Sequence, residues 1–310
     1  MQAIKFKQYG DNSVIFLEDS ATPKPNAQQV LVKIIAAAIN PVDWKIRSGA
    51  LQNMLPLTFP SGLGMDFSGV IEELGSEVSC FKKGDEVYGL SNFCGGNSGA
   101  FAEYALVNAD FIAVKPKNIS HCEAATLPMA GVSAWQALID YMQLKKGQKI
   151  LIHGGAGSIG TFAIQIAKAL GAYVATTASE DSRAFVEKLG VDRIINYRDE
   201  NFEKSLKNYD AVLDTVGGEV YKKSFQVLKK GGILVSMLEA PNQELMERYK
   251  VKAFVEFTEV TTERLNQFAK LITEHEIKIP IAKKFPLVEI KKALDFQQYQ
   301  HPRGKVVVET

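Results

Sequence analysis

The stretch "HGGAGSIG", residues 153–160, follows the apolar run "KILI" (149–152) and precedes a second, longer apolar stretch. Gly155, Gly157 and Gly160 fit the spacing G-x-G-x-x-G, and the flanking runs place this loop between a strand and a helix. In such loops the first glycine permits a tight turn, the second lets the backbone approach a pyrophosphate, and the third lets helix and strand pack closely. The stretch therefore predicts a dinucleotide-binding β-α-β unit, with the helix N-terminus facing the phosphates. The residues expected at the phosphates are Gly155, Ala156, Gly157, Ser158, Ile159 and Gly160.

The strand-helix pattern of this loop continues along the chain. Apolar runs such as "YVATTA" (173–178), "YDAVLDTV" (209–216) and "ILVSML" (233–238) alternate with helical patterns such as "YKKSFQVLKKGG". This alternation is typical of a parallel sheet with helices on both faces. The first 115 residues instead hold short strands separated by turn sequences such as "KKGDE", and "GKVVVET" near the end returns to that pattern. An α/β protein is expected, with a doubly wound parallel sheet beside a β-rich unit.

The end of the second strand of this unit helps to distinguish the two nicotinamide nucleotides. About 20 residues after the glycine loop, an acid commonly binds the ribose hydroxyl of NAD and would repel a 2′-phosphate. This chain has Ala178 there, followed by Ser179. Arg183 and Tyr197 could reach a phosphate, with a solvated helix charge as the alternative for Arg183. These residues predict NADPH as the preferred cofactor.

Composition argues against several classes of partner. Lys plus Arg total 36 against 35 for Asp plus Glu, so neither nucleic acid nor an acidic membrane surface is expected as a partner. No apolar run is long enough for a membrane span, and the N-terminal residues lack the apolar core of a signal peptide. The three cysteines, Cys80, Cys94 and Cys122, are too few for a disulfide framework and fit a reducing compartment, so a cytoplasmic protein is expected.

Several longer stretches, in order along the chain, resemble one known family. They include "AAAINPVDWKIRSG" (36–49), "FPSGLGMDFSGVIEELGSEVSCFKKGDEVYG" (59–89), "ATLPMAGVSAWQAL" (125–138) and "HPRGKVVV" (301–308). The resemblance is to the zinc-free quinone oxidoreductases of the medium-chain dehydrogenase/reductase superfamily, which include zeta-crystallin and plant enone oxidoreductases. It implies a Rossmann domain inserted into a β-rich, GroES-like catalytic domain, with the active site in the cleft between them. The implied domains are 119–275 for the Rossmann domain and 1–118 with 276–310 for the catalytic domain.

The same resemblance implies roles for individual residues. It places Asn40 near the nicotinamide. It also places Val216 and Leu238 beside the cofactor, at the carboxyl ends of their strands, which agrees with the general rule for open α/β sheets. Asn40 and Lys45 are expected in the loop after the strand "VLVKIIAAA".

Zinc-dependent relatives in this superfamily have a cysteine at the position of Asn40, a His-Glu pair at Met65-Asp66 and a third ligand near Met129. An amide and thioethers do not make a zinc site, which needs thiolate, imidazole and carboxylate ligands. The four-cysteine lobe of those relatives is reduced here to "SNFCGGNSG", where Cys94 is interpreted as an ordinary loop thiol. No metal is expected.

The expected chemistry follows from the missing Lewis acid. Hydride addition to an acceptor that is already electrophilic, a quinone or an enone, needs less help than alcohol oxidation, which relies on a stabilised alkoxide. Zeta-crystallin-like members carry a tyrosine two residues after the acid of "NPVD", whereas this chain has Lys45. Lys45 could donate to the developing oxyanion, or point to solvent or pair with Asp43, and Asp43 itself could be a structural acceptor or an acid. The candidate catalytic residues are Asn40, Lys45 and Asp43.

Together these observations predict a cytoplasmic, NADPH-dependent and zinc-independent reductase of quinones or α,β-unsaturated carbonyls. Two alternatives stay open: a trans-2-enoyl thioester reductase, and a non-catalytic NADPH-binding protein that acts as a sensor or interaction partner. Residues 251–261 are rich in β-branched and aromatic side chains, and by the resemblance they form an edge strand of the Rossmann sheet. Because an unpaired edge invites a second strand, a homodimer through this segment is expected.

Overall fold

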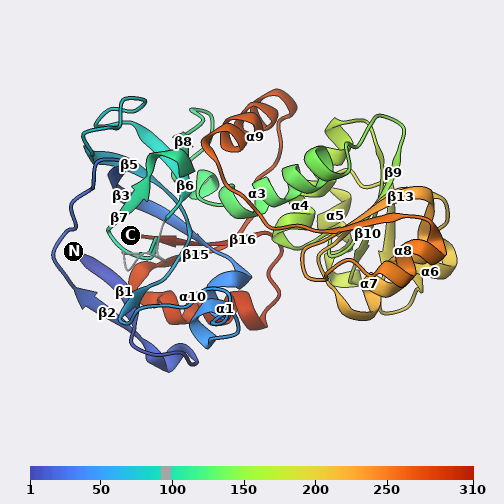
Figure 1. The fold of residues 1–310 in the computed structure, drawn as a ribbon, viewed down its shortest axis with the longest axis horizontal. Coiled ribbons are helices and arrows are strands. Elements are labelled where there is room, and N and C mark those ends of the chain that lie inside the picture. The colour runs from blue at the N-terminus through green and yellow to red at the C-terminus, as the bar shows by residue number, and fades with distance from the viewer. Residues whose placement is uncertain (92–98) are drawn as a thin grey trace. The chain divides into compact units, whose positions relative to one another are not determined.

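The computed structural model describes residues 1–91 and 99–310, so Cys94 and its expected role lie outside the described residues. The described chain divides into two compact units (Figure 1). The domain limits expected from the sequence, 119–275 for the Rossmann domain and 1–118 with 276–310 for the catalytic domain, stay a prediction. The first unit comprises Met1–Met129, Val260–Thr273 and Ile279–Thr310, and the second comprises Ala130–Glu259 and Glu274–Lys278.

The first unit is rich in β-structure, as the sequence predicts. Within the described residues its larger sheet has the order β15-β16-β3-β5-β6-β8, with β7 also paired to β3, and its smaller sheet has the order β2-β1-β4. The strands are β1 (Gln2–Phe6), β2 (Ile15–Asp19), β3 (Gln29–Ile39), β4 (Ser61–Gly62), β5 (Asp66–Leu74), β6 (Glu86–Leu90), β7 (Tyr104–Asn108), β8 (Ile112–Val114), β15 (Ile281–Pro286) and β16 (Lys305–Glu309).

The long strand β3 organises this unit because both of its faces are covered. Ala37 and Ile39 belong to the main apolar core of the unit. Ala36 and Ala38 point the other way and pack with Cys122 on helix α2 (His121–Ala124). Small side chains on that face let the helix approach the sheet closely, and the alternation follows from the two-residue period of a strand.

The segment after β3 is a helix, α1 (Pro41–Ser48), so the prediction that Lys45 lies in a loop was wrong, whereas Asn40 precedes the helix. The local sequence explains the helix. Asn40 is the N-cap, Pro41 occupies the first turn, and the Asp43 carboxylate accepts a hydrogen bond from the Asn40 backbone N–H at 2.7 Å. Gly49 ends the helix in the left-handed conformation, at φ 85°.

The remaining helices of the first unit cover the sheets and return the chain to them. Tyr88 is fully buried, and its hydroxyl donates to the Leu265 carbonyl on α9 at 2.7 Å, which attaches that helix to the β-rich core. Helix α3 begins in this unit and ends in the second. The helices are α2, α3 (Pro128–Trp135), α9 (Thr262–His275) and α10 (Ile290–Tyr299), with short 3₁₀ turns at Asn12–Val14, Ala109–Phe111 and Leu287–Glu289.

The second unit contains the predicted parallel sheet. In the described residues its strand order is β11-β10-β9-β12-β13-β14, and every neighbouring pair is parallel. The order reverses direction beside β9, the strand that leads into the glycine loop, which is where such sheets bind nucleotides. The strands are β9 (Lys149–Ile152), β10 (Tyr173–Ala178), β11 (Arg193–Asn196), β12 (Tyr209–Asp214), β13 (Leu228–Ser236) and β14 (Lys252–Val255).

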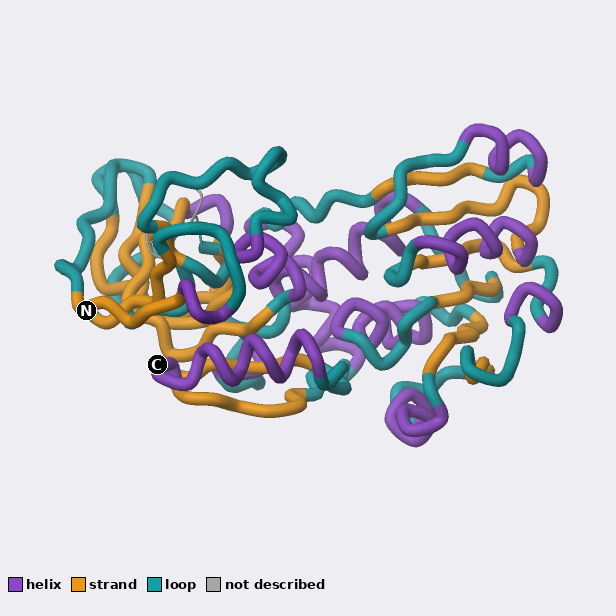
Figure 2. Tube along the Cα trace, turned by 90° about the horizontal axis from the view of Figure 1, so that it is seen from below, coloured by secondary structure: helices purple, strands orange, loops and turns teal. Residues whose placement is uncertain are grey.

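Helices pack around this sheet, as the tube view shows (Figure 2). Helix α4 contacts β9 and β10, whereas side chains of α6, α7 and α8 join a core that includes Leu151 and Val212. Within residues 1–91 and 99–310, none of the helices combines the length and the apolar character that a membrane span requires. The helical segments are α4 (Ser158–Ala169), α5 (Arg183–Glu187), α6 (Phe202–Ser205), α7 (Gly218–Ser224) and α8 (Gln243–Tyr249), with a π-helical segment at Gln136–Tyr141 and 3₁₀ turns at Glu180–Ser182 and Phe225–Val227.

The edge strand β14 comprises only Lys252–Val255 and is therefore shorter than the predicted strand 251–261. Beyond it, the backbone is bound by a side chain and not by a neighbouring strand. The Gln136 amide donates to the Phe257 carbonyl at 3.0 Å and accepts from the Glu259 N–H at 3.1 Å. Those groups are therefore unavailable to extend the sheet.

Candidate functional site

The glycine loop of the second unit has the geometry of a phosphate cradle. Gly157 is the N-cap of the twelve-residue helix α4 and brings no side chain to cap its first N–H groups. A Cβ added at Gly157 would meet only the Gly154 carbonyl oxygen, at 3.3 Å, so the space outside this residue is otherwise open. A Cβ at Gly160 would overlap the backbone of Gly154, which explains the third glycine as a packing requirement. The loop therefore fits a nucleotide pyrophosphate, with Ala156, Ser158 and Ile159 half-buried beside it.

A buried polar chain beneath the loop holds it in place. The Gly154 N–H donates to the Thr177 hydroxyl at 3.1 Å, and that hydroxyl lies 3.2 Å from His153 Nδ1. His153 Nε2 lies 3.0 Å from the Ser224 hydroxyl, which donates to the Val220 carbonyl at 2.7 Å. The hydrogen atoms match only if neutral His153 carries its proton on Nε2. Burial lowers the pKa of His153 to about 3, so this chain of hydrogen bonds persists throughout the neutral range.

The carboxyl ends of β12 and β13 are fixed by one buried carboxylate. Asp214 is fully buried and accepts hydrogen bonds from the N–H groups of Val216 and Gly217, each at 3.0 Å. It also accepts from the Ser236 hydroxyl at 2.8 Å. These bonds anchor the backbone while leaving the side chains of Val216 and Leu238 about half exposed, at 50% and 49%. The two residues thus lie at the strand ends where the sequence predicts them.

The end of β10 carries no acid, in agreement with the sequence. Ala178 is its last residue, and its carbonyl accepts from the Tyr197 N–H at 3.4 Å, so Tyr197 lies directly beside it. The guanidinium of Arg198 lies 5.9 Å from the Tyr197 ring centroid and 3.7 Å from the Asp181 carboxylate. Sequence reasoning missed Arg198, although an arginine next to the named tyrosine was a usable signal.

The two other residues predicted at this strand end make local contacts. Arg183 Nε donates to both carboxylate oxygens of Glu180, at 2.8 and 3.0 Å. Ser179 Oγ donates to Ser182 Oγ at 3.2 Å. The acids Glu180 and Asp181 are therefore each paired with an arginine, so the strand end does not present a bare negative charge to a ligand.

In the first unit, a buried polar cluster surrounds Asn40, where β3 ends and where β5 and β16 begin. The Lys305 ammonium donates to Asn40 Oδ1 at 2.6 Å, and Asn40 Nδ2 donates to an Asp66 carboxylate oxygen at 2.8 Å. Lys305 and Asp66 also form an ion pair at 3.4 Å, with side chains 2% and 0% exposed. The Met129 N–H donates to the second Asp66 oxygen at 3.1 Å. Burial raises the pKa of Asp66 and lowers that of Lys305, and each charge opposes the shift of the other.

Asp43 and Lys45 lie on α1 beside this cluster but have different environments. Asp43 is fully buried, and burial raises its pKa to about 7 despite the hydrogen bond from Asn40. Its second oxygen has no hydrogen-bond partner among the described residues. Lys45 is half-buried, with its ammonium 5.7 Å from the centroid of the Trp44 ring. Asp43 thus accepts a hydrogen bond at the start of α1. This is the structural role that the sequence offered as the alternative to an acid.

A zinc ion does not fit this part of the molecule. The Asn40 amide oxygen and the Asp66 carboxylate, which would have to act as ligands, are already bound by the Lys305 ammonium. A divalent cation there would be repelled by that ammonium and would lack the thiolate and imidazole ligands that zinc prefers. No group of three His, Cys, Asp or Glu side chains suited to a metal is present in residues 1–91 and 99–310.

Comparison with known proteins agrees with this architecture. Residues 26–117 match the alcohol dehydrogenase GroES-like domain, and residues 189–308 match a family model described as zinc-binding dehydrogenase. The mitochondrial NAD(P)H oxidoreductase RTN4IP1 of Mus musculus is 33% identical over 99% of this chain and 89% of its own length. The chloroplastic NADPH-dependent alkenal/one oxidoreductase of Arabidopsis thaliana is 35% identical over 99% of this chain and 79% of its own. A solved quinone oxidoreductase from Coxiella burnetii is 38% identical, with a TM-score of 0.91, covering 100% of this chain and 99% of that one.

A GroES-like β-rich unit and a parallel six-stranded sheet with a glycine loop define the medium-chain dehydrogenase/reductase fold. The relatives that are 33% and 38% identical cover nearly the whole chain. The chain belongs to the quinone oxidoreductase and enone oxidoreductase family of that superfamily, which confirms both the predicted family and the predicted fold class.

The pKa of His153 generates a prediction about acid stability. Its folded-state value of about 3 lies below the ordinary value near 6.5, so the unfolded chain binds the extra proton and stability falls as pH drops from about 6.5 toward 3. Between pH 7 and pH 5 the linkage amounts to about 2 kcal/mol. His153→Gln, a neutral side chain, should remove that part of the acid sensitivity. Denaturant titrations of both proteins at the two pH values measure it, and equal losses of stability would contradict the assignment.

Proposed function

We propose that this protein is an NADPH-dependent reductase of quinones and α,β-unsaturated carbonyl compounds. The observation that carries the proposal is the open glycine loop at Gly157, beside a strand end that has Ala178 in place of an acid. The relatives' names support the same reaction type, since one is an NADPH-dependent alkenal/one oxidoreductase and another a quinone oxidoreductase. Bound NADPH supplies the hydride for this chemistry.

The residues of the chain have to support the acceptor as it becomes negatively charged. When the β-carbon of an enone gains a hydride, the electron pair of the C=C double bond shifts toward the carbonyl oxygen. The resulting enolate takes a proton from solvent. Asn40 keeps one amide N–H beyond the one given to Asp66, and the Lys45 ammonium is not bound by the Asp43 carboxylate, which serves the helix start. We assign these two donors to the oxyanion, and Asp43 to holding the helix that carries Lys45.

Cofactor choice should follow from the charges at the end of β10. With Ala178 there and the neighbouring acids paired, we expect NADPH to bind at least about tenfold more tightly than NADH, roughly 1.4 kcal/mol. Ala178→Asp should shift the preference toward NADH by repelling the 2′-phosphate. Ala178→Asn is the matched control, because it has the same size without the charge. Calorimetric titration with both nucleotides measures the effect, and equal affinities in the parent would refute it.

The oxyanion donors should matter more for turnover than for cofactor binding. Loss of one such donor typically lowers turnover on the order of 10²-fold, so Lys45→Met and Asn40→Ala should slow enone reduction strongly and quinone reduction less. NADPH affinity should change little. Lys283→Met is a control, because Lys283 also lies over an aromatic ring, 4.8 Å from the centroid of Phe285.

The assay is NADPH oxidation with methyl vinyl ketone and with 1,4-benzoquinone as acceptors. Turnover of Lys45→Met within about twofold of the parent would show that Lys45 is only a surface charge. Tight NADPH binding without oxidation by either acceptor would favour the non-catalytic alternative. Oxidation by enoyl thioesters alone would favour a trans-2-enoyl thioester reductase.

We also propose a homodimer formed through the sheet edge at β14, and a cytoplasmic location. Strand β14 is the last in the sheet order, so one of its edges has no strand partner within the described chain. Light scattering at micromolar concentration should give twice the mass of the chain, and a monomer mass would contradict the proposal. The location stays a prediction, since relatives named above carry mitochondrial and chloroplastic names; imaging of a tagged chain in its own cell measures it.

A further inference from the structure

The side-chain amide of Asn40 is oriented by two neighbours of opposite character. Lys305 has only donors, and it meets the amide oxygen at 2.6 Å. Asp66 has only acceptors when ionised, and it meets the amide nitrogen at 2.8 Å. Reversing the amide would bring its NH₂ group against an ammonium and its oxygen against a carboxylate. One orientation is therefore enforced, and in it a single N–H of Asn40 is left to donate elsewhere.

A lysine at position 305 is unfavourable for the stability of the fold, because its ammonium is buried. It is the first residue of a strand that continues Val306-Val307-Val308, and it is 1% exposed. Burying an ammonium carries a large desolvation penalty, and an apolar side chain in such a place often stabilises a protein as well or better. The retained charge points to a task beyond packing.

We propose that Lys305 is a positioning residue that acts through Asn40. Its ammonium holds the amide oxygen, so that the free N–H of Asn40 is held in one direction. The adjacent positive charge also polarises the amide and strengthens that N–H as a donor to the developing oxyanion. This role rests on the proposed reductase function and assigns Lys305 no contact with the substrate.

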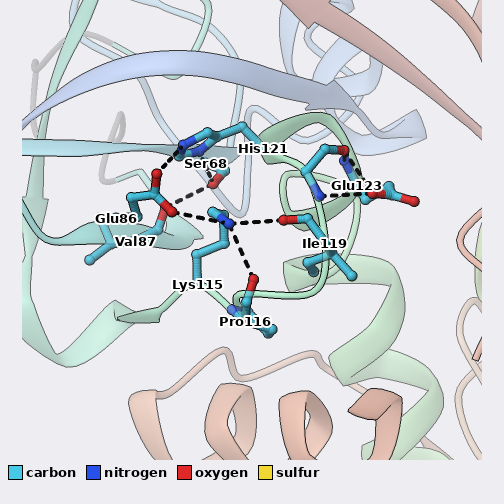
Figure 3. A network of polar contacts seen from close by, with 9 residues as sticks. Ser68, Glu86, Val87, Lys115, Pro116, Ile119, His121 and Glu123 are labelled. Atoms are coloured by element: carbon cyan, nitrogen blue, oxygen red, sulfur yellow. Dashed lines mark hydrogen bonds and ion pairs between the residues drawn. The ribbon is translucent and has the colours of Figure 1, made fainter. Parts of the chain in front are cut away.

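The structure offers a matched control in the same unit. Lys115 is also buried, at 6% exposure, and Figure 3 shows its ammonium directed at the carbonyls of Pro116 and Ile119 and at the Glu86 carboxylate. The distances are 3.2, 2.8 and 3.1 Å. Lys115→Met removes a buried ammonium of similar environment without touching Asn40.

The test compares Lys305→Met, Lys305→Arg and Lys115→Met for methyl vinyl ketone reduction, NADPH affinity and thermal unfolding. We expect Lys305→Met to lower kcat about tenfold with the NADPH Kd within about twofold of the parent, and Lys305→Arg to restore part of the loss. Lys115→Met should change the unfolding temperature but not kcat. In the double variant, adding Lys305→Met to Asn40→Ala should lower kcat by less than about twofold further, because the two residues act as one unit.

Unchanged kcat in Lys305→Met, or losses that multiply in the double variant, would overturn the positioning role. If Lys305→Met does not fold, Lys305→Gln tests the same role, because a neutral amide fills the same place without the positive charge that polarises Asn40. The same tenfold loss is expected there, and full activity would overturn the proposal. A parent that reduces neither an enone nor a quinone would overturn the proposed function, and this role with it. An active parent with unaffected variants overturns this role alone.

Discussion

The buried ion pair between Lys305 and Asp66 ties the ends of the chain into one unit. The two residues are 239 positions apart, and the chain passes through the entire second unit between them. Their charges meet only if β16 lies beside β3 and β3 beside β5, which is the observed order. Any other strand order, or a shifted register, would leave an ammonium or a carboxylate unpaired in a low-dielectric interior, at a cost of several kcal/mol. The electrostatics of the cluster and the topology of the sheet therefore require each other.

In the second unit, the buried polar groups that hold the glycine loop are satisfied by hydrogen bonds and not by an ion pair. Neutral His153 and the hydroxyls of Thr177 and Ser224 form a chain of hydrogen bonds in which every proton has an acceptor. Asp214 is buried but receives three donors, two of them backbone N–H groups of the turn it holds. Both arrangements fix backbone and leave side chains at the strand ends exposed. A rigid carboxyl edge with free side chains is what a bound nucleotide needs, because the backbone is then ordered before the ligand arrives.

The charges around Asn40 bear on the chemistry that this unit can support. The cluster holds one ammonium and the carboxylates of Asp66 and Asp43, so ionisation of Asp43 leaves an excess negative charge. Burial raises the pKa of Asp43 to about 7, which is above its unfolded value, so its ionisation costs folded-state stability as pH rises from about 4 toward 7. The Lys305 ammonium therefore balances the charge of Asp66, and it also partly offsets the negative charge that Asp43 adds when it ionises.

The sequence by itself determined the features that depend on neighbouring residues. Strand and helix periodicity predicted the parallel sheet, the spacing of Gly155, Gly157 and Gly160 predicted the phosphate cradle, and the predicted strand "VLVKIIAAA" lies within β3. The alanine at the end of β10 was also readable, because strand ends and glycine loops are local signals.

Only the tertiary structure decided which polar residues meet. Lys305 reads in the sequence as an ordinary lysine before an apolar strand, and Asp66 as the replacement of a zinc ligand. They become partners of Asn40 because β5 and β16, from distant parts of the chain, begin beside the point where β3 ends. The shortening of β14 has the same origin, since it depends on the side chain of Gln136, more than a hundred residues away. Local patterns encode local backbone, whereas the pairing of buried charges depends on strand order, which no short stretch of this sequence contains.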